Sequence, residues 1–272
     1  MAAETEGPDP ASSLLAFFGS ELRRLRTEAG MSQGQVAKEA HSTQAMISYI
    51  ELARRVPTIQ LAGDLDRVFQ TGGHFQRLHP LVLCHAYPSW YLPIVQIEGD
   101  ATSIRSFQSQ VIPGLLQTEE YARAMLTAVR SDNLEDLIAA RMSRQEIFER
   151  ELPPRAWFVV EEQALRRNIG GPEVMRGQLE RLLMAGTVPR IVIQVIPDRV
   201  AAHPGLAGPF AIFTVPDAPD MLYVDGFSQG RMGLDTAEVA DAAHAYDLLR
   251  AVSLSPEESA EVIGGYLEGL KR

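Results

Sequence analysis

The sequence predicts a chain of two parts, an α-helical N-terminal domain of about five helices and a C-terminal α+β domain with about four strands. Apolar residues at helical spacing predict the first part, and the stripe of its first helix consists of Leu14, Phe18, Leu22 and Leu25. Short apolar runs rich in β-branched residues predict strands in the second part, most clearly at residues 190–197. A hydrophobic content of 46% and a charged content of 22% are those of a globular protein.

The charge is unevenly distributed along the chain. The net charge of −10 divides into −3 over residues 1–12, +2 over residues 13–79 and −9 over residues 80–272. These ranges are also the expected parts of the chain: a disordered tail, a helical domain and an α+β domain. No apolar run approaches the ~20 residues of a membrane span, and a single cysteine, Cys84, fits a reducing compartment. We therefore expect a cytoplasmic protein with no membrane partner.

Residues 31–57 predict two short helices joined by a tight turn. A short basic segment, here called the basic exit, follows them and contains Arg54 and Arg55. Ser32 and Gln35 have the spacing of a capping box at the start of the first helix. Ser42 or Thr43 can cap the second helix, which we expect from Gln44 to Leu52.

The second of these helices has an apolar side and a polar side. Met46, Ile47 and Ile50 cluster on the apolar side. The polar side carries no acidic group and consists of Gln44, Ala45, Ser48, Tyr49 and Leu52. A DNA major groove accepts one α-helix, and a glutamine can make bidentate hydrogen bonds to an adenine edge. The helix is therefore a candidate for insertion into duplex DNA.

Three further side chains are candidates for contacts with the DNA backbone. Arg54 and Arg55 follow the helix at once and can reach phosphates, which position a protein without specifying a sequence. Gln33, at the start of the first short helix, would lie near another phosphate.

The same stretch resembles the helix-turn-helix family of phage repressors, called Cro/C1 or XRE. The resemblance covers roughly residues 13–70 and is carried by Gly30–Gln33, Val36–Ala37, Ser42–Gln44, Ile47–Ser48, Ile50–Glu51 and Arg54–Pro57. It implies that the side chains at the DNA are Gln33, Thr43, Gln44, Ala45, Ser48 and Tyr49. It also implies that Arg26 pairs with Glu51, which would brace the recognition helix and leave Arg26 near a phosphate.

Two positions depart from the family pattern. His41 stands where the turn usually has glycine, and histidine tolerates a left-handed backbone better than most residues. Ala53 replaces another usual glycine or asparagine, so we expect that the loop before Arg54 is shaped differently.

We expect a helix capped by Thr58 and a further helical segment at residues 74–85. From residue 91 onward the pattern of apolar residues changes, and it predicts strands as well as helices. Strands are expected at residues 156–160, 190–197, 210–215 and 221–224, with a hairpin joining the last two. Helices are expected at residues 161–167, from Pro172, and at 236–251 and 256–270.

This second part resembles an actinobacterial domain of unknown function, DUF5753, over roughly residues 90–265. The matching segments are Ile112–Thr118, Tyr121–Arg123, Ala140–Gln145, Glu162–Arg166, Met175–Leu179, His203–Phe210 and Tyr223–Asp225. In that family the domain follows a Cro/C1-type domain, and the proteins are grouped as antitoxin-like transcriptional regulators. The resemblance implies regulation and supplies no ligand.

Catalytic and metal sites receive little support. Residues 226–230 fit the pattern G-x-S-x-G around Ser228, but a nucleophile elbow needs a helix directly after it and an acid and a histidine on later strand ends. Three histidines and Cys84 at residues 74–85 lack the spacing of paired metal ligands, and Pro80 interrupts them. We therefore expect no cofactor, no metal and no enzymatic activity.

The sequence thus favours a nucleoid-associated transcriptional regulator that binds double-stranded DNA, with a C-terminal domain for dimerisation or sensing. A homodimer is expected because two-fold dimers bring two readers to half-sites about one DNA turn (~34 Å) apart. Three alternatives stay open, and the first two are an antitoxin-like protein that binds a small partner protein encoded nearby and a repressor gated by a small molecule. An esterase at Ser228 is the third.

Overall fold

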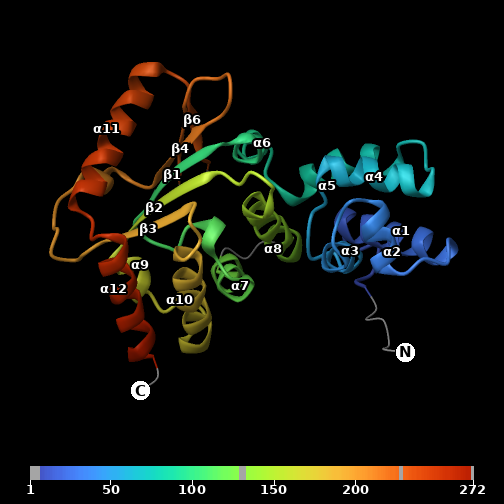
Figure 1. The fold of residues 1–272 in the computed structure, drawn as a ribbon, viewed down its shortest axis with the longest axis horizontal. Coiled ribbons are helices and arrows are strands. Elements are labelled where there is room, and N and C mark those ends of the chain that lie inside the picture. Colours follow the sequence, from blue (N-terminus) through green and yellow to red (C-terminus); the bar gives the residue numbers. More distant parts are fainter. Residues whose placement is uncertain (1–6, 129–132, 227–228, 271–272) are drawn as a thin grey trace. The chain divides into compact units, whose positions relative to one another are not determined.

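The computed structural model describes residues 7–128, 133–226 and 229–270 and divides into two compact units (Figure 1). The first, here the helical unit, comprises Met1–Leu92 together with Arg130–Ser143. The second, the sheet unit, comprises Pro93–Val129 and Arg144–Arg272. The expected boundary between residues 79 and 80 falls inside a helix of the first unit.

The helical unit consists of six described helices. They are α1 (Leu14–Glu28), α2 (Gln33–Glu39), α3 (Gln44–Glu51), α4 (Ile59–Phe69), α5 (His74–Ala86) and α8 (Leu134–Ser143). The first five are the predicted helices. Their core contains Phe18, Leu22, Val36, Ile47, Ile50, Leu65 and Phe75, each fully buried. The stripe of α1 is centred one residue away from the predicted one, because Leu15 is buried whereas Leu14 and Leu25 are half-buried.

Helix α5 continues through Pro80, in agreement with the helical segment expected at residues 74–85. Its first turn has no side-chain cap from its own N-cap residue, Gly73. Instead, the buried carboxylate of Asp66 on α4 accepts hydrogen bonds from the backbone nitrogens of Phe75 and Gln76, both at 2.9 Å. This long-range cap joins α4 to α5 and satisfies backbone donors that a helix start otherwise leaves unpaired. Of the expected tail, residues 7–12 form a turn in which Asp9 accepts from Ala11, and residues 1–6 lie outside the described range.

The sheet unit is built on six strands in the order β3-β2-β1-β4-β5-β6. They are β1 (Ser103–Gln108), β2 (Arg155–Glu161), β3 (Ile191–Ile196), β4 (Phe210–Thr214), β5 (Met221–Val224) and β6 (Arg231–Gly233). Strands β1, β2 and β3 are parallel, and β4, β5 and β6 continue the sheet in antiparallel fashion. The α+β class is as predicted, and the hairpin between β4 and β5 forms where it was expected.

The sequence analysis did not predict two of the strands, β1 and β6. Strand β1, SIRSFQ, carries a charged and several polar side chains, and it is a central strand all the same because β2 and β4 pair with it on its two sides. Strand β6 has three residues and ends in a glycine, which is too short for a periodic pattern.

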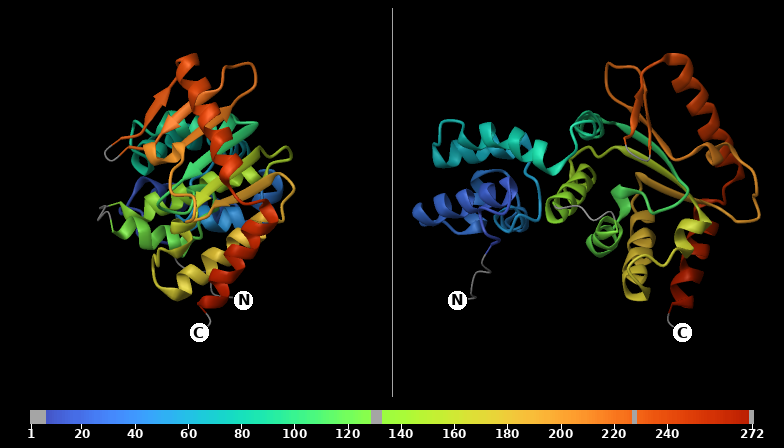
Figure 2. Two further views of the ribbon diagram at one scale, coloured as in Figure 1. Left: turned by 90° about the vertical axis from the view of Figure 1, so that its left-hand side faces the viewer. Right: turned by 180° about the vertical axis from the view of Figure 1, so that it is seen from behind.

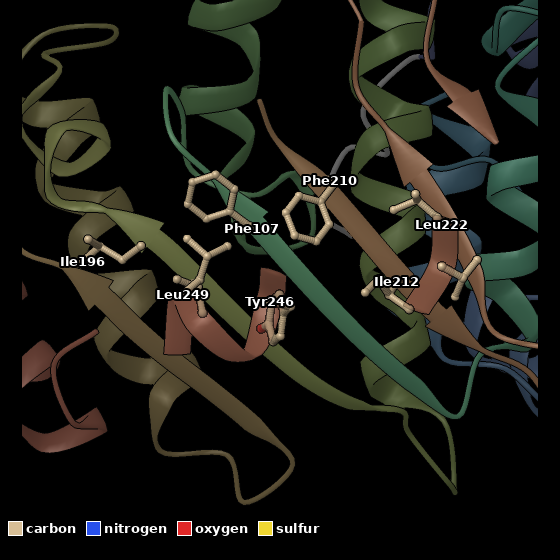
Figure 3. Packing of buried hydrophobic residues seen from close by; sticks show 9 residues of the cluster. Phe107, Ile196, Phe210, Ile212, Leu222, Tyr246 and Leu249 are labelled. Carbon is tan, nitrogen blue, oxygen red and sulfur yellow. The ribbon is translucent and has the colours of Figure 1, made fainter. Parts of the chain in front are cut away.

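Helices cover both faces of the sheet (Figures 1 and 2). Helix α11 (Thr236–Val252) lies on one face, and α10 (Pro172–Gly186) and α12 (Pro256–Gly269) lie on the other. Under α11, the buried cluster comprises Phe107, Val159, Ile196, Phe210, Ile212, Leu222, Val239, Tyr246 and Leu249 (Figure 3). The remaining elements are α6 (Leu92–Asp100), α7 (Glu119–Thr127), α9 (Glu162–Arg166) and the 3-10 turns at Gly114–Leu116, Arg144–Glu149 and Pro204–Ala207.

Within the described ranges, no helix is both long and apolar enough to cross a membrane. The same residues contain no group of three or more His, Cys, Asp or Glu side chains that could hold a metal ion.

Candidate nucleic-acid interface

Helices α2 and α3 form the two helices of the motif, and each begins at a side-chain cap. Ser32 and Gln35 form the capping box: the serine Oγ accepts from the Gln35 nitrogen at 3.3 Å, and the Gln35 Oε1 accepts from the Ser32 nitrogen at 2.7 Å. Thr43 caps α3 by accepting from the Met46 nitrogen at 3.1 Å. Because both starts are fixed locally, α3 begins at its predicted first residue, Gln44, and it ends one residue before the predicted Leu52.

Both helices end in a left-handed residue that is not glycine. His41 has φ 51° after α2, and Ala53 has φ 54° after α3. Each end forms the two hydrogen bonds of a Schellman motif. After α2 these are His41 N to Lys38 O at 3.4 Å and Ser42 N to Ala37 O at 2.8 Å, and after α3 they are Ala53 N to Ile50 O at 3.0 Å and Arg54 N to Tyr49 O at 2.8 Å. The loop before Arg54 thus takes the shape that glycine would give it, contrary to our expectation, and Ala53 bears the strain of a left-handed backbone.

The polar side of α3 is open to solvent. Thr43, Gln44 and Ala45 are exposed, Ser48 is half-buried, and Tyr49 is 39% exposed. Among the residues expected on the apolar side, Ile47 and Ile50 are fully buried and Met46 is half-buried.

The basic exit follows the helix directly. Arg54 is exposed, and Arg55 is half-buried with its guanidinium 4.9 Å from the centre of the Tyr49 ring. The Arg55 Nη1 also donates to the Arg54 carbonyl at 2.7 Å. The Arg55 guanidinium is therefore held between the Tyr49 ring and the Arg54 carbonyl.

Arg26 and Glu51 form a buried, bidentate ion pair beneath α3. The Arg26 Nε donates to Glu51 Oε1 at 2.6 Å and its Nη2 donates to Glu51 Oε2 at 3.1 Å. Arg26 also donates to the Met31 carbonyl, and Gln33 Nε2 donates to Glu51 Oε2 at 2.9 Å. The network joins α1, α2 and α3. Since Arg26 is only 4% exposed, it supports the helix from within and does not lie at the surface where a phosphate would bind.

A glycine brings α1 against the end of α3. A Cβ added at Gly19 would clash with the carbonyl oxygen of Ile50 and lie 3.1 Å from that of Glu51. The sequence analysis did not identify Gly19, although a glycine inside an amphipathic helix is a known signal of close packing.

His79 on α5 holds the far side of the exit. Its Nε2 lies 2.9 Å from the Pro57 carbonyl oxygen, and the side chain is buried. Burial lowers the pKa of His79, while the hydrogen bond to Pro57 opposes that shift. The neutral imidazole therefore donates to the carbonyl.

The candidate catalytic serine belongs to the sheet unit. Ser228 lies outside the described residues, but the chain on its two sides is described: β5 precedes it, and β6 follows it as the antiparallel partner. A strand therefore follows where a nucleophile elbow requires a helix.

A pocket of about 270 Å³ is lined by Leu165, Arg166, Asn168, Met175, Tyr266 and Leu270. Burial raises the pKa of Tyr266 to about 12, so its hydroxyl is neutral and donates to Glu162 at 2.7 Å.

Comparison with known families gives two matches. The model of a helix-turn-helix domain matches residues 18–77, which run from within α1 to the first residues of α5. The model of a domain of unknown function, DUF5753, matches residues 91–265. No curated protein matches, and no solved structure matches.

Proposed function

Because the chain belongs to the DUF5753 family and carries a helix-turn-helix domain before that region, we propose that it is a sequence-specific transcriptional regulator of the repressor-like XRE type. The observation that carries the proposal is the polar side of α3, which is exposed while a buried ion pair holds the opposite side in place. A helix so presented fits the major groove of duplex DNA.

The side chains of this interface receive distinct roles in the proposal. Gln44 binds a base edge, and Thr43, Ala45, Ser48 and Tyr49 line the rest of the groove. The net charge of residues 13–79 is modest, so backbone contacts fall mainly to the two arginines that follow α3.

Arg54 and Arg55 contact phosphates in this arrangement, and Gln33 contributes a further phosphate contact. The amide nitrogen of Gln33 carries two hydrogens, and Glu51 accepts one of them. The second hydrogen can donate to a phosphate without breaking the network under α3. Such contacts fix the register of the protein on the duplex and leave the sequence to be specified by the groove.

The C-terminal region sets the oligomeric state or senses a partner in this proposal. A homodimer acting in the cytoplasm, at the nucleoid, would bring two α3 helices to half-sites about one DNA turn apart. Sedimentation of the full chain with and without a two-half-site duplex tests this, since a monomer on both would contradict the dimer.

The test of DNA reading is selection of bound duplexes from a random pool with the full chain, followed by Gln44→Ala. We expect the variant to lose about 1–3 kcal/mol at one base position and to become tolerant there. The matched control, Arg54→Ala, should weaken all duplexes alike and make the salt dependence shallower by about one unit. Equal losses on selected and random DNA for Gln44→Ala would remove its proposed role.

A further inference from the structure

Helix α8 belongs to the helical unit although its residues lie within the DUF5753 match. It lies against α5, and its buried residues are Asp136, Ile138, Ala139, Ala140 and Met142. The chain on both sides of it, Pro93–Val129 and Arg144–Arg272, is assigned to the sheet unit. A segment of the DUF5753 region is therefore part of the unit that carries the proposed DNA interface.

Hydrogen bonds attach α8 to both ends of the helical unit's sequence. Ser13, the N-cap of α1, donates to Asp136 Oδ1 at 2.9 Å. His85 Nε2 lies 3.1 Å from Asp136 Oδ2, and the Tyr87 hydroxyl donates to the Ala140 carbonyl at 2.7 Å. These contacts fix the position of α8 on α1 and α5.

The last residue of α8 reaches the exit from the recognition helix. The Ser143 Oγ accepts from the Val56 nitrogen at 2.7 Å and donates to the Ala139 carbonyl at 2.7 Å. Val56 is 4% exposed, so its N–H has no ready access to water if the serine is lost. With His79 on the Pro57 carbonyl, two consecutive residues after the arginines are held from α8 and α5.

We propose that Ser143 is a positioning residue for DNA binding, which acts through the backbone of Val56 to aim Arg54 and Arg55 at phosphates. The inference rests on the proposed function. The two arginines lie within the four residues 53–56. The left-handed backbone of Ala53 fixes the first of these residues, and the hydrogen bond from the Val56 nitrogen to Ser143 fixes the last, so both guanidinium groups project from a backbone held on both sides. Without the hydroxyl, the Val56 nitrogen must move to find another acceptor, and the arginines move with it.

The experiment measures affinity of the full chain for a selected and a random duplex over a series of salt concentrations. For Ser143→Ala we expect a loss of about tenfold on both duplexes, and a salt slope shallower by about one unit for each arginine that leaves its phosphate. Base preference should stay intact. Ser143→Thr, which keeps the hydroxyl, should restore both quantities. Ser253→Ala is the matched control, since that serine makes the same bond to the carbonyl four residues earlier, and it should bind as wild type.

A double-mutant cycle separates positioning from folding. In a background of Arg54→Ala and Arg55→Ala, removal of the Ser143 hydroxyl should change the salt slope no further. If Ser143→Ala lowers the folded fraction, the isosteric pair Ser143→Val and Ser143→Thr gives the same comparison. Equal slopes for the variants with and without the hydroxyl overturn the inference. If the wild type shows no preference among duplexes, the proposed function itself fails, and the two failures are thereby distinguished.

Discussion

The helical unit and the sheet unit bury polar side chains of different kinds. The buried polar residues described in the helical unit are all ionisable: Arg26, Glu51, Asp64, Asp66, His79 and Asp136. Those described in the sheet unit are mostly neutral: Ser106, Gln117, Gln178, Gln194 and Ser259, beside Glu98 and the buried side chain of His203. Glu98 is bound bidentately by Arg144, with both contacts at 2.7 Å.

Two of the neutral groups, Gln178 and Gln194, join separate segments of the chain with both ends of one amide. Gln178 donates to the Leu116 carbonyl at 2.8 Å and accepts from the Thr118 nitrogen at 2.8 Å. Gln194 donates to the Leu254 carbonyl and accepts from the Trp157 indole. An amide has a donor and an acceptor at every pH, whereas the hydrogen bonding of a buried carboxylate or imidazole depends on its protonation state. The proposed DNA interface is therefore supported by buried side chains whose hydrogen bonding depends on pH, whereas most buried polar side chains described in the sheet unit form hydrogen bonds that do not.

Glu51→Gln tests that contrast most strongly. It removes the charge that Arg26 requires in a buried site and should destabilise the helical unit by about 3–5 kcal/mol. DNA affinity should fall with it, because α3 loses its support. The free energy of unfolding, read from the slowest-exchanging amides of α1 and α5, measures the effect.

The control for Glu51→Gln is Arg24→Gln, which removes ion pairs with Glu21 and Glu28 at the surface of α1. Exposed pairs contribute little, so this variant should exchange as wild type. Unchanged exchange and unchanged DNA affinity in Glu51→Gln would show that the buried pair does not brace α3.

Gly19→Ala and Gly177→Ala make the same substitution in the two units and should have opposite signs. Alanine normally favours a helix over glycine by about 1 kcal/mol, and Gly177 of α10 has open space around its Cα, so its variant should be stabilised by about that amount. At Gly19 the new Cβ meets the carbonyl of Ile50, and overpacking should cost about 1–3 kcal/mol. Thermal and chemical unfolding of the two variants measures both; a stabilising Gly19→Ala would contradict the close approach of α1 to α3.

The sequence revealed the features of the site that depend on residues near one another. The capping box at Ser32 and the cap at Thr43 span three residues each, so spacing was enough to place α2 and α3. The pairing of Arg26 with Glu51, which the structure shows, was available only through the family resemblance. The contacts of His79 and Ser143 join residues 22 and 87 positions apart, and no local pattern records them. Strand β1 escaped for a similar reason, since its place in the sheet depends on partners far along the chain.

His79→Gln tests how the stability of the helical unit depends on pH. The pKa of His79 is lowered in the folded protein, so the unfolded chain binds more protons below its ordinary pKa of about 6.5. The stability that His79 confers is therefore complete above about pH 6.5 and is lost as the pH falls towards the folded-state pKa, by at most about 1.4 kcal/mol per pH unit. A glutamine can donate to the Pro57 carbonyl without titrating, so the variant should lose this part of the acid sensitivity. Amide exchange of the helical unit between pH 7 and pH 5 checks it; equal pH slopes for the two proteins would contradict the assignment.

Ala53→Gly tests a smaller difference between the two units, which is the type of residue that takes a left-handed backbone conformation in each. Among the described residues of the helical unit, His41, Ala53 and Gln70 take positive φ beside Gly30, Gly72 and Gly73. In the described sheet unit Asp217 is the non-glycine residue that does so, beside Gly170, Gly171 and Gly208. A left-handed conformation costs an alanine about 1–2 kcal/mol, and glycine avoids that cost but loses more chain entropy on folding. We therefore expect Ala53→Gly to stabilise the helical unit by about 1 kcal/mol or less, measured by chemical unfolding. Because Ala53 precedes Arg54, the same change frees the exit loop, and DNA affinity should stay level or fall slightly while stability rises. A loss of stability would mean that the strain at Ala53 is already offset by contacts of its methyl group.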